Sequence, residues 1–344
     1  MKRFLKVLLR VFVTVLVTIF MVATVLIFSI FMITHGPSEN AKNIFVTTML
    51  ETGQMKWLVG LFMEEDEINR IINSNSMEAL EDDTNEELIE VTSEKEDINE
   101  INVYYEEGDN FSAIMMVVND PSRVFVGSTY PFTEYGKELN QIVEQFGAVG
   151  GINGGLYEST LNKGGYPYGI VVSNGQLVNT NGLNNAGLVL IGMSESNVLK
   201  IIDINGMSED EVLTILDEEK LRDAICFQEE SSDSNNHFVK LIINGEKRLA
   251  NGLGSGANPR TAIGQTADGK MLLLVTDGRG ASGHLGATAS DLIDIMEKYG
   301  AVNAANIDGG SSSSMFYEGQ YLQTSVTLYY NNSSWRIPTA WLVK

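Results

Sequence analysis

Three glycine-containing turns in this sequence of 344 residues carry polar side chains that could do chemistry. They are Asn153-Gly154-Gly155, Asp277-Gly278-Arg279 and Asp308-Gly309-Gly310. Two carboxylates are the groups that most glycosidases use, one as an acid and the other as a base or nucleophile. Glycine lets the backbone turn sharply and approach a ligand closely. Each turn taken alone is an ordinary Asp-Gly or Asn-Gly turn, so a site is predicted only if the turns meet.

Positive and hydrogen-bonding groups beside these turns suit a phosphate ester. A serine run follows Gly310, and its N–H groups and hydroxyls fit phosphate oxygens. Guanidinium groups match phosphate by bidentate geometry, and a chain of net charge −22 needs such local positive charge to bind an anion. We predict Asp308 and Asp277 as catalytic carboxylates, without assigning the base. The predicted substrate-binding residues are Arg260, Arg279, Asn153, Gly154, Gly309, Gly310, Ser311 and Ser312.

The elements around the two aspartates form a recognisable unit. Met271–Thr276 is a continuous apolar run, typical of a strand covered on both faces. Thr288–Tyr299 has the capping-box spacing and apolar stripe of a helix, and Ala301–Ile307 is the next predicted strand. A strand, a crossover helix and a second strand almost always give parallel strands. Asp277 and Asp308 are therefore expected at one carboxyl edge of the sheet, where open α/β sheets bind ligands.

An internal echo supports a duplicated half. Ile142–Val149 (IVEQFGAV) aligns with Ile295–Val302 (IMEKYGAV), and both precede a strand that ends in a Gly-Gly turn, INGG or IDGG. The echo places Asn153, expected to orient a sugar hydroxyl or a water, at an edge equivalent to that of Asp308. The predicted fold is α/β, a mixed sheet with βαβ crossover units and an internal duplication, preceded by one transmembrane helix.

The N-terminus has the pattern of a membrane anchor. Val11–Ile33 is a run of 23 residues without a charge, long enough to cross the hydrocarbon core. Four basic residues precede it, which favours a cytoplasmic N-terminus and an extracellular catalytic domain at the cell membrane. A signal peptide is the alternative, but the run is longer than a usual signal core and no Ala-x-Ala follows it.

Composition divides the rest of the chain. Residues 1–34 are the expected tip and anchor, 35–76 a helical stalk, 77–100 an acidic flexible linker and 101–344 the folded domain. The linker has 11 acidic residues against one basic residue and no aromatic residue, so it buries too little apolar surface to order itself.

The same composition excludes several classes of site and partner. The acidity argues against a nucleic-acid partner, and the single cysteine, Cys226, excludes an intramolecular disulfide or a cysteine zinc cluster. No metal or cofactor motif is present, His284 is expected as a surface histidine, and the oligomeric state stays open.

Together the motifs resemble the phosphodiester glycosidase family, which has lysosomal members and bacterial members associated with exopolysaccharide biosynthesis. The resemblance rests on GGINGGLY (Gly150–Tyr157), NPRTAIG with the following DGR (Asn258–Arg279), and NIDGGSSSS (Asn306–Ser314), and it covers about 101–344. Some members have glycine where this chain has Ser311. The resemblance implies shared polar positions at Asn153, Arg260, Asp277, Arg279 and Asp308.

The function expected from these features is a membrane-anchored hydrolase that cleaves the glycosidic C–O bond of a sugar-1-phosphodiester, acting on a surface polysaccharide or another phosphodiester-linked glycan. Two alternatives stay open. One is a non-catalytic carbohydrate-binding or assembly protein in exopolysaccharide biosynthesis, and the other is a phosphodiesterase that cleaves the P–O bond.

Overall fold

The computed structural model describes residues 2–51, 55–80, 83–91, 97–158, 160–229, 238–325 and 333–344. The chain divides into two compact units, 1–74 and 75–344, and each is described by itself. The second unit contains all three glycine turns.

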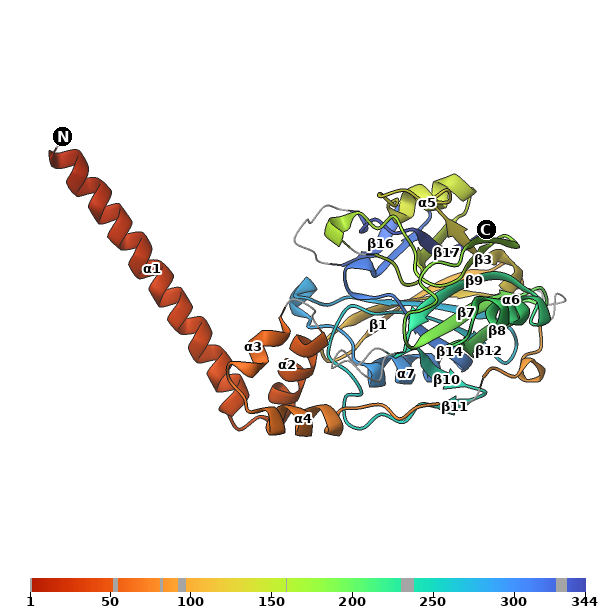
Figure 1. Cartoon of the computed structure of the whole chain (residues 1–344), viewed down its shortest axis with the longest axis horizontal. Helices are drawn as coiled ribbons and strands as arrows, with labels where there is room; N and C mark the ends of the chain where they lie inside the picture. The colour runs from red at the N-terminus through yellow and green to blue at the C-terminus, as the bar shows by residue number, and fades with distance from the viewer. Residues whose placement is uncertain are drawn as a thin grey trace. The chain divides into compact units, whose positions relative to one another are not determined.

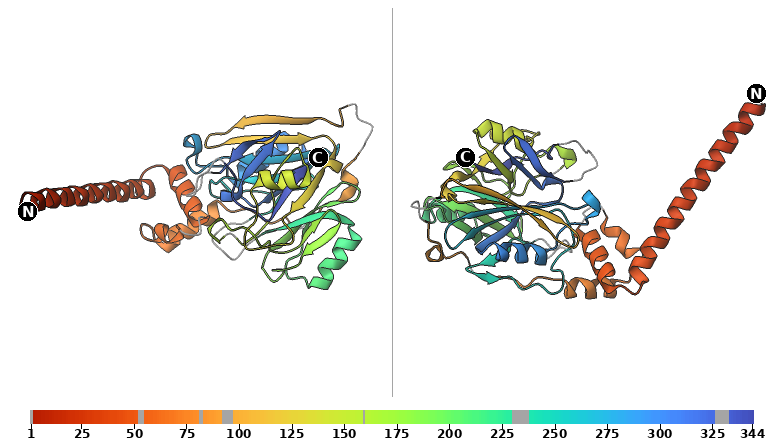
Figure 2. Two further views of the ribbon diagram at one scale, coloured as in Figure 1. Left: turned by 90° about the horizontal axis from the view of Figure 1, so that it is seen from above. Right: turned by 180° about the vertical axis from the view of Figure 1, so that it is seen from behind.

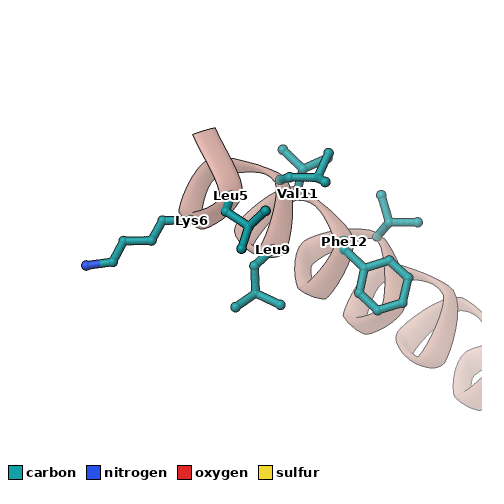
Figure 3. Close-up of a pocket in the computed structure, with 7 residues that line it drawn as sticks. Leu5, Lys6, Leu9, Val11 and Phe12 are labelled. Carbon is teal, nitrogen blue, oxygen red and sulfur yellow. The ribbon is translucent and has the colours of Figure 1, made fainter. Parts of the chain in front are cut away.

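The first unit begins with α1 (Lys2–His35), a helix long and apolar enough to cross a membrane. None of its most apolar stretch is buried in the protein, and the side chains around Leu5, Leu9 and Phe12 project from a lone helix (Figure 3). This composition fits a retained anchor or a signal sequence. Three shorter helices follow and share a small core of Val46, Leu50, Val59, Met63 and Ile71: α2 (Glu39–Glu51), α3 (Lys56–Gly60) and α4 (Glu65–Ser74).

Three antiparallel sheets build the second unit (Figure 1). The first has seven strands in the order β1 (Ile101–Glu107), β2 (Ser112–Val118), β13 (Met271–Thr276), β12 (Thr261–Thr266), β14 (Ala301–Ile307), β10 (Lys240–Ile243) and β11 (Glu246–Lys247). The second has β16 (Gln320–Thr324), β15 (Ser314–Tyr317), β4 (Gly150–Asn153), β17 (Thr339–Val343) and β3 (Val124–Ser128). The third has β6 (Gln176–Asn179), β5 (Val171–Ser173), β9 (Leu221–Gln228), β7 (Leu188–Ser194) and β8 (Leu199–Asp203).

One apolar core joins the three sheets, with members such as Ile263 in β12, Trp341 in β17 and Ile191 in β7, all fully buried. Each sheet then buries its other face against its own helix (Figure 2). The helix α7 (Ala289–Lys298) covers the seven-stranded sheet, α5 (Leu139–Phe146) covers the second and α6 (Glu209–Glu218) the third. The fold is therefore mixed α/β, as predicted, with sheets in the centre and helices outside.

The predicted βαβ unit is present in a split form. The strands β13 and β14 both pair antiparallel with β12, so they run parallel to each other, with β12 between them. Thr288 caps α7 through the predicted capping box with Asp291. The prediction of parallel strands is confirmed, but the two strands are not neighbours.

The internal echo has a structural counterpart in the second sheet. The strands β3 and β4 are connected by α5, and both pair antiparallel with β17, which lies between them. The unit β3-α5-β4 therefore repeats the split arrangement of β13-α7-β14. Both units end in the Gly-Gly turns that the sequence comparison aligned.

The acidic segment differs from the flexible linker expected over 77–100. Its described residues are bonded to the domain: Asp83 pairs with the buried Lys240 at 3.2 Å, and Glu86 pairs with the buried Lys200 at 3.0 Å. The backbone N–H of Glu90 also donates to the carbonyl of Ala267 at 2.8 Å. The composition of 77–100 alone predicted disorder. The ion pairs could not be foreseen from it, because the lysines that bind these carboxylates lie more than a hundred residues away in sequence.

Candidate active site

The sheet brings three of the predicted site residues to one edge. Thr261, the first residue of β12, pairs with Val275 of β13 on one side and with Ile307 of β14 on the other. Arg260 therefore enters this edge just before β12, where β13 and β14 deliver Asp277 and Asp308. The predicted convergence of the strand ends is confirmed by this register.

Asp308 has the most unusual carboxylate at this edge. Its Oδ2 is buried and has no hydrogen-bond partner among the described residues. Burial raises the pKa of Asp308 to about 7, although the Ser312 hydroxyl, the Gly309 N–H and the charge of Arg279 all act to lower it. A carboxyl with this pKa and one unpaired oxygen is suited to exchange a proton near neutral pH.

Arg279 lies next to this carboxyl and to the serine turn. Its Nη1 donates to the Ser311 hydroxyl at 2.8 Å. Surrounding protein lowers the pKa of Arg279, the positive charge of Arg260 lowers it further, and Asp308 raises it, so the three charges interact. Arg279 is nevertheless exposed, so its guanidinium is placed to meet an anion from solvent.

Gly310 lies close to Arg279 and has a backbone conformation that favours glycine. Gly310 has φ +61°, a left-handed conformation that side chains disfavour, and a Cβ there would lie 2.7 Å from Nη2 of Arg279. Its N–H donates to the carbonyl of Pro259 at 2.8 Å, and the N–H of Ser312 donates to Gly309 at 3.1 Å. These two N–H groups are bonded within the protein, whereas the sequence predicts that N–H groups of this run bind phosphate; for the others, the prediction stands. The Ser311 hydroxyl and the Arg279 guanidinium lie together beside this turn.

Arg260 is held from several sides. Its Nη2 donates to Ser255 Oγ at 3.1 Å and to the Gly256 carbonyl at 2.7 Å, and its guanidinium lies 5.1 Å from the ring centroid of Phe238. Arg260 thus supplies a fixed positive charge behind Arg279. These three partners carry no motif that sequence reasoning could have singled out.

Asn153 joins the two repeated turns. Its Nδ2 donates to the backbone carbonyl of Asp308 at 2.6 Å, and its Oδ1 accepts from the Thr261 hydroxyl at 2.8 Å and from the Ser314 N–H at 3.1 Å. The side chain is fully buried. These bonds differ from the sugar contact expected from the sequence and make Asn153 a positioning residue for the Asp308 turn. Close packing explains the glycine at position 154, because a Cβ there would lie 2.4 Å from Thr339 Oγ1.

Asn153→Ala should destabilise the protein rather than act on substrate binding. It leaves a buried carbonyl, hydroxyl and N–H without partners, and one such group costs about 1–3 kcal/mol. We expect the free energy of unfolding in urea to fall by about 3 kcal/mol. Asn110→Ala, in the loop before β2, is the control. Asn140 in α5 is unsuitable because its Oδ1 accepts a hydrogen bond from the Tyr321 hydroxyl. An unchanged urea midpoint with a raised KM would contradict the positioning role.

Asp277 has partners of its own. Its Oδ1 accepts from the Ser112 N–H at 2.7 Å, and its Oδ2 lies 2.8 Å from Nδ1 of His284. His284 is therefore part of an aspartate–histidine pair and not the isolated surface histidine expected from the sequence. The loop from Asp277 to Gly286, closed by a bridge between Gly278 and Gly286, carries this pair and Arg279 together.

Tyr157 is a site residue that sequence reasoning did not single out. Its hydroxyl lies 2.8 Å from Ser312 Oγ, which in turn binds the carboxylate of Asp308. Burial, and then the charge of Asp308, raise the pKa of Tyr157 well above its usual value, so the phenol stays neutral and able to donate. The tyrosine ends the motif GGINGGLY, in which the chemical argument from sequence used only the asparagine and the glycines. Among the described residues, no group of three or more His, Cys, Asp or Glu side chains is arranged to hold a metal ion.

Comparison with solved structures supports this architecture. The catalytic domain of zebrafish N-acetylglucosamine-1-phosphodiester alpha-N-acetylglucosaminidase, auto-inhibited by its pro-peptide, has a TM-score of 0.58 and 18% identity, over 74% of this chain and 86% of that one. This likeness establishes a shared fold. A hypothetical protein from Synechocystis has a lower TM-score of 0.45 at 17% identity, over 71% of this chain and 62% of that one.

Sequence comparisons give a curated relative and a family. A SPbeta prophage-derived uncharacterized protein, YomE, of Bacillus subtilis (strain 168) is 40% identical over 65 residues, which are 19% of this chain and about a tenth of that protein. The phosphodiester glycosidase family model matches residues 146–344, more than half of the chain, and includes all three glycine turns. On this match, the chain belongs to the phosphodiester glycosidase family.

Proposed function

We propose that this protein hydrolyses the bond between a sugar and the phosphate of a sugar-1-phosphodiester. The observation that carries the proposal is the unpaired, buried Oδ2 of Asp308 beside Arg279 and the Ser311 hydroxyl. A proton-exchanging carboxyl and an anion-binding guanidinium therefore share one site. Membership of the phosphodiester glycosidase family supports this class of reaction, and the name of the zebrafish protein specifies a sugar-1-phosphodiester as its substrate.

The charges of the site fit the electron flow of C–O cleavage. A water attacks the anomeric carbon and gives a proton to Asp308, while the glycosidic C–O pair leaves with the phosphate. The released phosphate monoester is a stable anion, so it needs positive charge more than a proton. Arg279 and the serine hydroxyls supply that stabilisation, with Arg260 behind them. The Asp277–His284 pair is a second acid–base group at the same edge and completes the proposed carboxylate pair.

The N-terminal helix suggests where this reaction takes place. Lys2, Arg3, Lys6 and Arg10 precede the apolar run of α1, and basic residues are retained on the cytoplasmic side. We therefore place the catalytic unit outside the cell, tethered by one span, with a phosphodiester-linked surface glycan as substrate.

The full chain, purified in detergent, tests the reaction with a panel of sugar-1-phosphodiesters in ¹⁸O-water. N-acetylglucosamine-1-phosphodiesters are the first probes, with the Asp308→Asn variant as the inactive control. Release of ¹⁸O-labelled sugar is the expected result. Label in the phosphate would show P–O cleavage and overturn the proposal. Binding of the panel without turnover would favour the carbohydrate-binding alternative.

A further inference from the structure

A pocket lies beside the loop that follows β4. It has a volume of about 450 Å³ and is lined by Glu134, Glu158, Thr160, Lys163, Gly165 and Tyr166. None of these residues belongs to the site described above. Tyr166 is 46% exposed, so a large part of its ring is open to a ligand.

Glycines allow the backbone segments beneath this pocket to pack in direct contact. A Cβ on Gly136 would lie 2.0 Å from the carbonyl oxygen of Gly164, and one on Gly165 would lie 1.8 Å from that of Thr133. Backbone segments from three parts of the chain therefore cross in direct contact, with the third at Arg336, whose N–H donates to Asn162 Oδ1 at 2.7 Å. Such crossings leave little freedom, so the lining side chains stand on a rigid base.

Two consecutive residues of the same loop have a left-handed backbone conformation. Leu161 and Asn162 are consecutive non-glycine residues with φ of +50° and +58°, and Leu161 is also 70% exposed. Strained conformations of this kind persist only where the surrounding structure holds them, and they cluster at ligand sites. The surrounding structure therefore holds this loop in place beside the pocket.

The loop connects this pocket to the catalytic edge. Tyr157 forms a bridge with Pro167, and the N–H of Glu158 donates to the carbonyl of Tyr166 at 2.9 Å. Neighbouring side chains of an extended segment point to opposite sides. Tyr157 accordingly reaches inward to Ser312, whereas the exposed Glu158 lines the pocket. The pairing of Tyr157 and Glu158 with Tyr166 and Pro167 therefore contributes residues both to the catalytic edge and to the pocket.

The chemistry of the lining selects one class of ligand. The lining has two carboxylates and one ammonium, and Lys163 is already paired with Glu134, so a phosphate is disfavoured here. Carboxylates accept hydrogen bonds from hydroxyls, and a tyrosine ring packs against C–H groups. A sugar ring offers both surfaces. From these observations we propose that the pocket holds an uncharged sugar unit of the glycan whose phosphodiester is bound at Arg279; the assignment rests on the proposed function.

Two N-acetylglucosamine-1-phosphodiesters separate this subsite from the catalytic centre. One has methanol as its alcohol, and the other has a neutral tetrasaccharide. Tyr166→Ala should raise KM for the tetrasaccharide ester about five- to tenfold, with KM for the methyl ester and both kcat values unchanged. Glu158→Gln should act in the same direction. Tyr105→Ala, which removes a tyrosine 69% exposed on β1, is the matched control. Equal KM values for the variant and the wild type with both esters would overturn the subsite.

A binding measurement keeps the subsite testable if no ester is hydrolysed. The free neutral tetrasaccharide is titrated calorimetrically into the full chain carrying Asp308→Asn, with and without Tyr166→Ala. Binding that weakens five- to tenfold on Tyr166→Ala supports the subsite whether or not hydrolysis is found. Tighter binding of a sulfated tetrasaccharide than of the neutral one would contradict the charge argument and overturn the assignment.

Discussion

Asp308→Asn should remove almost all hydrolytic activity and, at alkaline pH, make the protein more stable. The amide keeps the shape of the carboxyl but does not exchange a proton, so we expect kcat to fall about 10²- to 10⁴-fold. The gain in stability follows from the raised pKa, because above neutral pH the wild type must hold a charged carboxylate in a buried position.

The sign of this effect depends on pH. Unfolded Asp308 has the ordinary pKa of 3.8, and folded Asp308 has one of about 7. Between these values the folded protein binds a proton that the unfolded chain releases, so wild-type stability falls as pH rises through this range and then levels off. The asparagine variant lacks this loss. Its advantage should grow by about 2–3 kcal/mol between pH 5 and pH 8.5, or about 5–10 °C in Tm.

Thermal unfolding at the two pH values measures this difference. Asp294→Asn, an exposed aspartate in α7, is the control and should change neither the activity nor the pH dependence of Tm. An advantage of Asp308→Asn that is the same at pH 5 and pH 8.5 would show that the wild-type carboxyl has an ordinary pKa.

Arg279→Lys should be nearly as damaging as Arg279→Ala. Lysine keeps the positive charge but presents one ammonium in place of a planar guanidinium, which here reaches both Ser311 and the space beside Gly310. We expect kcat/KM to fall about 10²- to 10³-fold in both variants. Steady-state kinetics on a sugar-1-phosphodiester measure this loss. Full activity of the lysine variant would show that only the net charge matters.

Glycine substitutions test the same guanidinium without removing it. Gly310→Ala imposes the left-handed backbone on an alanine and pushes Arg279 away, whereas Gly319→Ala has a similar φ of +82° with open space around it. Both should lose some stability, but only Gly310→Ala should reduce kcat/KM by more than tenfold. Equal losses in the two variants would mean that the effect is one of folding.

The sequence predicted the elements whose signals are local. The apolar run of β13 and the capping box of α7 specify their structures without help from distant residues, and the register then brings Asp277 and Asp308 to one edge. The strand β12 was not predicted, because Thr261–Thr266 has small and polar residues and no alternation. It becomes a strand because β13 and β14 form backbone hydrogen bonds with it on both sides.

Site roles that depend on three-dimensional neighbours were harder to predict. Asp308 and Arg279 were predicted together because their glycine turns have a recognisable pattern, and the structure brings their charges close enough to interact. The direction of a side chain at a strand end has no sequence signal, so Asn153 was expected to face a sugar although it is bonded to the Asp308 turn. The aspartate–histidine pair was missed for the same reason, since the six residues between Asp277 and His284 give no sign of a closed loop.

The ion pairs of the acidic segment have a consequence for proteolysis of this chain. Cleavage before Asn75 would release the domain with Asp83 and Glu86 still neutralising Lys240 and Lys200. Cleavage just before Ile101 would instead remove Asp83 from the buried Lys240 and Glu86 from the buried Lys200, and Lys200 would keep its second carboxylate partner, Glu219, at 2.8 Å. Because the acidic segment supplies carboxylates to buried lysines of the second unit, a cut before the segment and a cut after it should differ in their effect on the stability of that unit.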